Sequence, residues 1–228
     1  MENMKRYAVY YAPKAGAFAE AAAAWLGWDA QKGCAVGQPA VALPRSLANI
    51  TAEPRKYGFH GTLKPPFRLA DGVSFDDLSN AVASVAARLH PLVMAGLEMV
   101  NLQGFLALVP QGDLAPLQAL AAEVVGLLEP CRAALSPPEI ARRKPDSLTV
   151  RQRELLAIYG YPYVMEQFRF HLTLTGTLAD AELAAVTRAA LAHIKAVLPR
   201  PFRLDDLCLF GEDDRGQFHL LHRYSLSA

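Results

Sequence analysis

Two short motifs of the same form carry the residues best suited to chemistry. The first contains His60 and Thr62, the second contains His171 and Thr173, and both read Phe-His-x-Thr-Leu. Because imidazole titrates at a pKa of about 6.5, a pair of histidines can supply a general base and a general acid to one reaction. A threonine hydroxyl beside each ring can donate a hydrogen bond to an oxygen on which negative charge develops. These residue types suit attack on a phosphate ester.

Each motif lies in a run with the alternation of a β-strand, in which successive side chains point to opposite faces. In segment 57–64 the polar face carries His60, Thr62 and Lys64. In segment 168–175 it carries Arg169, His171, Thr173 and Thr175. We therefore predict two strands, each with one apolar face and one face that presents a histidine and a hydroxyl.

The pattern that follows each motif also repeats. After each histidine come a helical pattern and then two strand-like runs. The last of these runs begins at Phe105 in the first copy and at Phe218 in the second, 45 and 47 residues after the respective histidine. This spacing predicts two copies of one supersecondary unit, and two copies are too few for a solenoid.

Two His-x-Thr motifs on strands in related halves resemble the 2H phosphoesterases, or LigT-like superfamily. Segments 55–67 (RKYGFHGTLKPPF) and 160–163 (GYPY) resemble its bacterial DUF1045 branch, whose members are often associated with phosphonate-utilisation operons. The resemblance covers nearly the whole chain. It implies two antiparallel-sheet lobes around a central cleft lined by the motif strands, and a phosphodiesterase that needs neither a metal nor a cofactor.

The elements around the motifs are predicted from periodicity and from the residues that punctuate it. We expect helices at 18–28, 74–89, 114–129, 149–159 and 180–198, and strands at 7–12, 94–102, 105–109, 202–210 and 217–225. Ser74 and Thr149 have the form of helix N-caps, the latter in a capping box with Gln152. Segments 29–56 and 131–147 are long irregular connections, and we expect the first to cover the site.

No low-complexity linker separates the halves, so we predict a single α+β domain over residues 1–228 built from two lobes. The resemblance adds that the lobes are pseudo-symmetric, each an antiparallel sheet with helices on the outside.

A phosphate substrate requires nearby positive charge. Lys64 and Arg169 are candidates because they share the histidine faces, and Arg142 and Arg143 because loops often bring such groups to sites. A solvated basic loop is the alternative for the latter pair. Aromatic residues that could stack on a base or bind phosphate are Tyr11, Tyr57, Tyr161 and Tyr163; a packed turn is the alternative for the last two.

The symmetry of the motifs leaves the acid and base roles open; as a working hypothesis we take His171 as base and His60 as acid. The remaining histidines are expected to be structural or solvated. His219 and His222 should face opposite sides of a strand and so cannot share a metal ion. No carboxylate or cysteine has a spacing that would complete a metal site, and we predict no metal.

Composition limits the function classes. Lys and Arg number 23 against 22 Asp and Glu, and this balance disfavours a general nucleic-acid binder. Cys34, Cys131 and Cys208 fit neither a metal motif nor a disulfide framework, which favours a reducing compartment. Segment 15–28 is too short to cross a bilayer, and residues 1–6 do not read as a signal peptide. We expect a cytoplasmic protein with no membrane partner.

The leading hypothesis is a metal-independent phosphodiesterase that hydrolyses a small cyclic phosphate or phosphoribosyl compound, in phosphonate metabolism by resemblance alone. The first alternative is RNA end processing at a 2′,3′-cyclic phosphate or 2′–5′ bond, which the near-neutral charge disfavours. The second is a non-catalytic nucleotide or sugar-phosphate binding protein. The expected partner is a small phosphorylated substrate, and the oligomeric state stays open.

Overall fold

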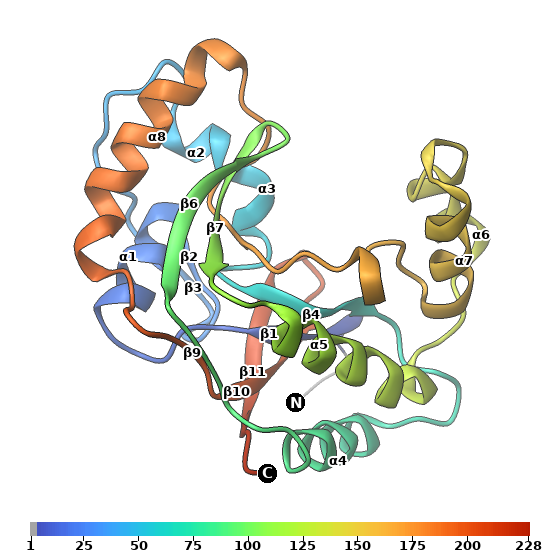
Figure 1. The fold of residues 1–228 in the computed structure, drawn as a ribbon. Helices are drawn as coiled ribbons and strands as arrows, with labels where there is room; N and C mark the ends of the chain where they lie inside the picture. The colour runs from blue at the N-terminus through green and yellow to red at the C-terminus, as the bar shows by residue number, and fades with distance from the viewer. Residues whose placement is uncertain (1–3) are drawn as a thin grey trace.

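A computed structural model describes residues 4–228 as an α+β fold built around one seven-stranded antiparallel sheet (Figure 1). The strand order is β11-β10-β1-β4-β8-β7-β6. Two small sheets pair β2 with β3 and β5 with β9. The strands are β1 (Arg6–Tyr11), β2 (Trp28–Asp29), β3 (Cys34–Ala35), β4 (Gly61–Phe67), β5 (Leu92–Met94), β6 (Gly96–Leu102), β7 (Phe105–Gln111), β8 (Leu172–Thr173), β9 (Phe202–Leu204), β10 (Asp206–Glu212) and β11 (Phe218–Ser225).

Helices α1, α4, α5 and α8 contribute buried residues to one core, together with the face of β1 that carries Tyr7, Val9 and Tyr11. Helix α5 packs on β4, α4 packs on β10 and β11, and α8 packs on α1. In Figure 1, α1 and α8 lie at the opposite end of the view from α6 and α7. The helices are α1 (Ala17–Leu26), α2 (Leu47–Ile50), α3 (Ala52–Arg55), α4 (Phe75–Ala86), α5 (Ala115–Leu127), α6 (Pro137–Arg142), α7 (Val150–Tyr159) and α8 (Asp180–Ile194), with 3₁₀ turns at Glu129–Cys131, Pro145–Ser147, Met165–Gln167 and Lys195–Val197. None of the described helices is long and apolar enough to cross a membrane.

The two predicted lobes are the two halves of the sheet, joined where β4 meets β8. One half consists of β4, β1, β10 and β11, and the other consists of β8, β7 and β6. Gly61 and Leu172 form the pairing that joins them. The halves exchange hairpins: β6-β7 follows the first motif in sequence, but β7 pairs with β8, the strand of the second motif. The β10-β11 hairpin follows the second motif, but β10 pairs with β1, which in turn pairs with β4 of the first motif. The repeat is confirmed. The exchange of hairpins between the halves could not be predicted, because it does not change the number of residues between each histidine and the strands that follow it.

The predicted apolar stripes form the core. Leu78, Val82, Val85 and Leu89 of the α4 segment are all buried, and so is the α5 stripe at 117, 120, 124 and 128. Ser74 caps α4 through a capping box with Asp77, and Thr149 caps α7 through one with Gln152. Reciprocal bonds of this kind satisfy amide groups that a helix start would leave unpaired. The helix predictions are confirmed to within a turn, except that α8 ends at Ile194, four residues before its predicted end.

The two connections contain short elements that the sequence reading missed. Segment 29–56 holds the β2-β3 hairpin, α2 and α3, and segment 131–147 holds α6. Helix α6 begins with a capping box between Ser136 and Glu139 and with two prolines in its first turn. Proline is tolerated there because the first helical amides have no intrahelical acceptor. Six residues are too few for the apolar periodicity that identified the longer helices.

The motif strands are shorter than predicted. Instead of 57–64 and 168–175, the ladders cover Gly61–Phe67 and Leu172–Thr173, so each histidine lies immediately before its strand. Gly58 has a φ of 69°, a left-handed conformation that turns the chain before the first ladder can begin. The 3₁₀ turn Met165–Gln167 plays the same part before the second.

Candidate active site

The junction between the halves sets the two motifs face to face. Antiparallel pairing of Gly61 with Leu172, extended by one residue each way, places His60 opposite Thr173 and His171 opposite Thr62. Residues opposite one another, and residues two apart on one strand, point to the same face of a sheet. All four side chains therefore lie on one face, in an arrangement with approximate two-fold symmetry.

Both imidazoles are held by the same local bond. Nδ1 of His60 lies 2.9 Å from the carbonyl oxygen of Gly58, and Nδ1 of His171 lies 2.8 Å from that of Arg169. Because a carbonyl oxygen can only accept, Nδ1 donates in each case. In the neutral ring, Nε2 then carries the lone pair and is the atom that can take a proton.

The surroundings of His60 favour its neutral form. The ring stacks on Tyr10, with centroids 4.0 Å apart, and Tyr57 lies 5.7 Å away. Burial lowers the pKa of His60, the bond to the Gly58 carbonyl opposes this, and a charge on His171 adds to the lowering, so that the pKa is about 4. His60 is thus an unprotonated acceptor at neutral pH, which favours it as the base and is the reverse of the working hypothesis.

This shift predicts a loss of stability on acidification. The pKa of His60 falls from 6.5 to about 4 on folding, so between these values the unfolded chain binds a proton that the folded protein does not. The free energy of unfolding should therefore drop by about 2 kcal/mol from this group between pH 7 and pH 5. Urea titrations at both pH values measure this, and the difference should shrink by that amount in His60→Asn. An equal pH dependence in both proteins would contradict the shift.

A cleft of about 360 Å³ opens in front of the motifs. The hydroxyl of Thr175 accepts from the amide of Leu106 at the cleft wall and so helps to hold β7 in place. Within residues 4–228, the Thr62 and Thr173 hydroxyls make no hydrogen bond and remain free for a ligand. His171 lies at the edge of the cleft, with its ring 5.7 Å from Phe105, a lining residue. The predicted site residues that line the cleft are Tyr57, His60, Thr62, Arg143, Tyr161 and Thr173.

Lys64 does not face the cleft, although strand alternation predicted that it would share a face with His60 and Thr62. Its amine is buried, 2.9 Å from Glu129 Oε2 and 3.1 Å from the Val125 carbonyl oxygen. Tyr10 pairs with Thr62 and Val9 pairs with Lys64, so Leu63 is an extra residue in β4. Such a bulge interrupts the alternation of faces. The prediction that Lys64 shares the histidine face is wrong for this reason.

Four other candidates lie away from the cleft lining. Arg169 is exposed and donates back to the carbonyls of Glu166 and Phe168. Tyr163 is 48% exposed and packs edge-on against Tyr161. Tyr11 is buried in the core against Phe170 and Phe202. Arg142 lines an adjoining pocket instead.

Sequence reasoning missed Tyr10 and Arg6, which both line the cleft. Arg6 binds Glu212 through two hydrogen bonds of 2.5 and 2.8 Å. Arg6 and Tyr10 are an even number of residues apart on β1, so their side chains point to the same face of the strand, and Tyr11 points to the other. The signal that could have identified Tyr10 instead of Tyr11 is a charged residue, Arg6, four positions away on the same face of the strand.

Gly61 is required by packing. A Cβ at this position would lie 2.3 Å from the Phe170 ring of the other motif. The absence of a side chain at Gly61 thus permits the close approach of an aromatic ring. The contact locks the two motifs together directly beside the histidines.

Comparison with known proteins gives the following relationships. Residues 62–219 match the family described as "Protein of unknown function (DUF1045)". A protein of Janthinobacterium sp. (strain Marseille), described as "Ribose 1,5-bisphosphate phosphokinase PhnN", is 36% identical over 222 residues, which are 94% of this chain and 49% of that protein. One of the same description from Laribacter hongkongensis (strain HLHK9) is 35% identical over 216 residues, with 92% and 49% covered. The chain therefore spans about half the length of these curated relatives.

Solved structures also align along the chain. E. coli LigT in apo form aligns with a TM-score of 0.45 and 15% identity over 100% of both chains. LigT complexed with 3'-AMP aligns with a TM-score of 0.41 and 17% identity, over 99% of this chain and 100% of that one.

Proposed function

The chain belongs to the DUF1045 family, and from this premise and the geometry of the cleft we propose that it is a phosphodiesterase that opens a small cyclic phosphate. The observation that supports the proposal is the pairing of Gly61 with Leu172, which brings the two motifs together beside a cleft that His60, Thr62 and Thr173 line. Among residues 4–228, no three His, Cys, Asp or Glu side chains are grouped as metal ligands. We assign the proton transfers to His60 and His171, whose Nδ1 atoms donate to backbone carbonyls and leave Nε2 for the substrate.

In the proposed reaction, Nε2 of His60 takes a proton from a water molecule as its oxygen bonds to phosphorus. The bond from phosphorus to one ring oxygen breaks, and His171 gives a proton to that oxygen. One water is consumed and a phosphate monoester forms. Thr62 and Thr173, opposite the histidines in the ladder, donate to the non-bridging oxygens, where charge grows during attack.

The electrostatics of the cleft fit an anionic ligand. Arg143 lines the cleft, and its guanidinium lies 4.8 Å from the centre of the Tyr161 ring. A phosphate anion bound beside His60 would raise the pKa of that ring from its value of about 4, because an opposite charge stabilises the imidazolium. The base would thus gain proton affinity only when the substrate is bound.

The substrate class that we propose is a cyclic phosphate on ribose, used in phosphonate-related metabolism. The name of the two relatives refers to ribose 1,5-bisphosphate, and this chain covers about half of each. A phosphorylated ribose is the simplest compound that could be the product of such a phosphodiesterase and also the substrate of the kinase activity in the name of these relatives.

Phosphorus NMR of the purified protein with EDTA tests the function. The panel contains ribose cyclic phosphates, nucleoside 2′,3′-cyclic monophosphates and an RNA oligonucleotide that ends in a 2′,3′-cyclic phosphate. We expect the cyclic resonance of a ribose compound to convert to that of a monoester. Conversion of the oligonucleotide alone would indicate RNA end processing. Binding without conversion of any compound would indicate a non-catalytic binding protein, and conversion abolished by EDTA would contradict chemistry by histidines alone.

A further inference from the structure

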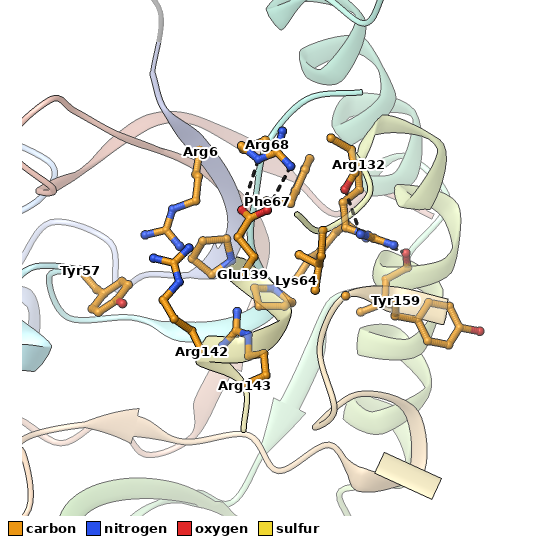
Figure 2. Close-up of a pocket in the computed structure, with 16 residues that line it drawn as sticks. Arg6, Tyr57, Lys64, Phe67, Arg68, Arg132, Glu139, Arg142, Arg143 and Tyr159 are labelled. Carbon is orange, nitrogen blue, oxygen red and sulfur yellow. Dashed lines mark hydrogen bonds and ion pairs between the residues drawn. The ribbon is translucent and has the colours of Figure 1, made fainter. Parts of the chain in front are cut away.

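A second pocket, of about 200 Å³, adjoins the cleft (Figure 2). The two cavities share Arg6, Tyr57, Pro65, Pro66 and Arg143 as lining residues, so they lie next to each other. The second cavity is rich in cations, and we call it the basic pocket. Its cationic lining residues are Arg6, Lys64, Arg68, Arg132, Arg142 and Arg143.

Four of these cations have carboxylate partners that account for their positions. Arg6 binds Glu212, and Arg68 binds Glu139 with hydrogen bonds of 3.2 and 3.0 Å. Glu129 accepts from both Lys64 and Arg132, at 2.9 and 2.8 Å. The pocket and its immediate partners therefore comprise six cations and three carboxylates.

The surplus positive charge lies on Arg142 and Arg143. Within residues 4–228, neither guanidinium makes an ion pair or a hydrogen bond. Arg143 lies over the Tyr161 ring, and Figure 2 shows the Arg142 and Arg6 side chains directed toward one another. Like charges repel when they converge, so this arrangement is favoured when an anion lies between them. A helix-anchoring role explains Arg68 and Arg132, whose guanidinium groups also bind backbone carbonyls, but it does not explain Arg142.

We propose that the basic pocket binds a second, monoester phosphate of the substrate, so that the protein acts on a cyclic phosphate that carries a further phosphate group. This inference rests on the proposed function in placing the cyclic phosphate in the cleft. Guanidinium groups bind phosphate oxygens through paired, charge-assisted hydrogen bonds. Arg143 lines both cavities and can contact both phosphates. Because the basic pocket is the smaller cavity, it suits a phosphate better than a further nucleotide.

The first test compares ribose 1,2-cyclic phosphate with and without a phosphate on O5, in the wild type and in Arg142→Gln. A lost charge-assisted contact should lower kcat/KM for the doubly phosphorylated compound roughly tenfold or more. The loss for the compound with one phosphate should be several times smaller. Lys144→Gln is the matched control, since it removes the same charge from the next exposed basic residue, which lines neither cavity. It should not change the ratio between the two substrates.

A second variant has the opposite expected sign. The Glu139 carboxylate is the acidic group that lines the basic pocket, and hydrogen bonds from Arg68 lower its pKa to about 2. In Glu139→Gln the capping box with Ser136 can persist, because glutamine also serves at that position. The repelling charge is removed and Arg68 is released for a ligand. Calorimetry should show tighter binding of ribose 1,5-bisphosphate, with little change for ribose 1-phosphate.

Failure of this inference is distinguishable from failure of the proposed function. If the wild type opens both cyclic compounds and Arg142→Gln slows both by the same factor, the phosphodiesterase function stands and the second phosphate site is wrong. If the wild type opens neither, the proposed function is wrong, and calorimetry with the two ribose phosphates still tests the pocket. Equal affinity for ribose 1,5-bisphosphate and ribose 1-phosphate in the wild type would overturn the site.

Discussion

His60→Asn and His171→Asn should each lower kcat for a cyclic phosphate by roughly 10²–10⁴-fold, the usual loss when a positioned proton-transfer group is removed. Asparagine retains a donor near the position of Nδ1, so the bonds to the Gly58 and Arg169 carbonyls can persist. Only the acid–base function of Nε2 is lost. Single-turnover assays of each variant with an excess of enzyme measure the effect on the chemical step.

The matched control is His222→Asn, because His222 is exposed and lies outside the cleft lining. It should retain nearly full activity. The double variant should be little worse than the single ones, since groups that act in one step are strongly non-additive. Retention of most activity by His60→Asn would rule out the two-histidine reaction.

Lys64→Ala should destabilise the fold by about 3 kcal/mol, as it leaves a cavity and removes a buried charge partner of Glu129. Burial lowers the pKa of Lys64 while Glu129 raises it, so the pair holds an amine that is otherwise costly to bury. Lys64→Met fills the same space without the charge and should cost less, because Arg132 still binds Glu129. Urea unfolding of both variants measures the difference.

A structural role for Lys64 predicts that alanine is clearly worse than methionine in stability. Equal and small losses of stability in the two variants would contradict the buried ion pair. They would return Lys64 to the role of phosphate ligand that its position in the motif first suggested.

The sequence was sufficient for the parts of the fold that follow local rules. The repeated Phe-His-x-Thr-Leu motif identified two equivalent strands, and the stripe from Leu78 to Leu89 identified a buried helix face. The Ser74 and Thr149 caps marked helix starts within a residue. Strand alternation, helical periodicity and helix capping each act between residues that are close in the sequence, so the sequence alone reveals them.

The features that the sequence did not reveal depend on contacts between distant segments. Alternation placed Lys64 beside the histidines, but its pairing with Val9 across a bulge turned it to Glu129. The exchange of hairpins between the halves depends on which strands pair along the edges of the sheet. The number of residues between a motif and its hairpin does not determine this pairing. Tyr10 became a neighbour of His60 only through the register between β1 and β4.

The candidate cleft was predictable in its centre and less so at its edge. His60, Thr62 and Thr173 were named from the motifs, Arg143 as a loop cation and Tyr161 as an aromatic residue that could bind a base or phosphate; all five line the cleft. Arg169, named for its place on the histidine face, and Tyr163, named with Tyr161, lie outside it. Residues on strands are placed by the ladder, whereas the direction of a loop side chain depends on neighbours that sequence alone does not identify.

A crystal structure of the protein with vanadate, which imitates phosphorus under attack, tests the central claim most directly. We expect one vanadate ion in the cleft, with Nε2 of His60 and Nε2 of His171 on opposite sides of it at hydrogen-bond distance and with both threonine hydroxyls on its oxygens. Vanadate bound only in the basic pocket, or bound in the cleft by one histidine while the other points away, would contradict the claim that the two motifs act on one phosphorus atom.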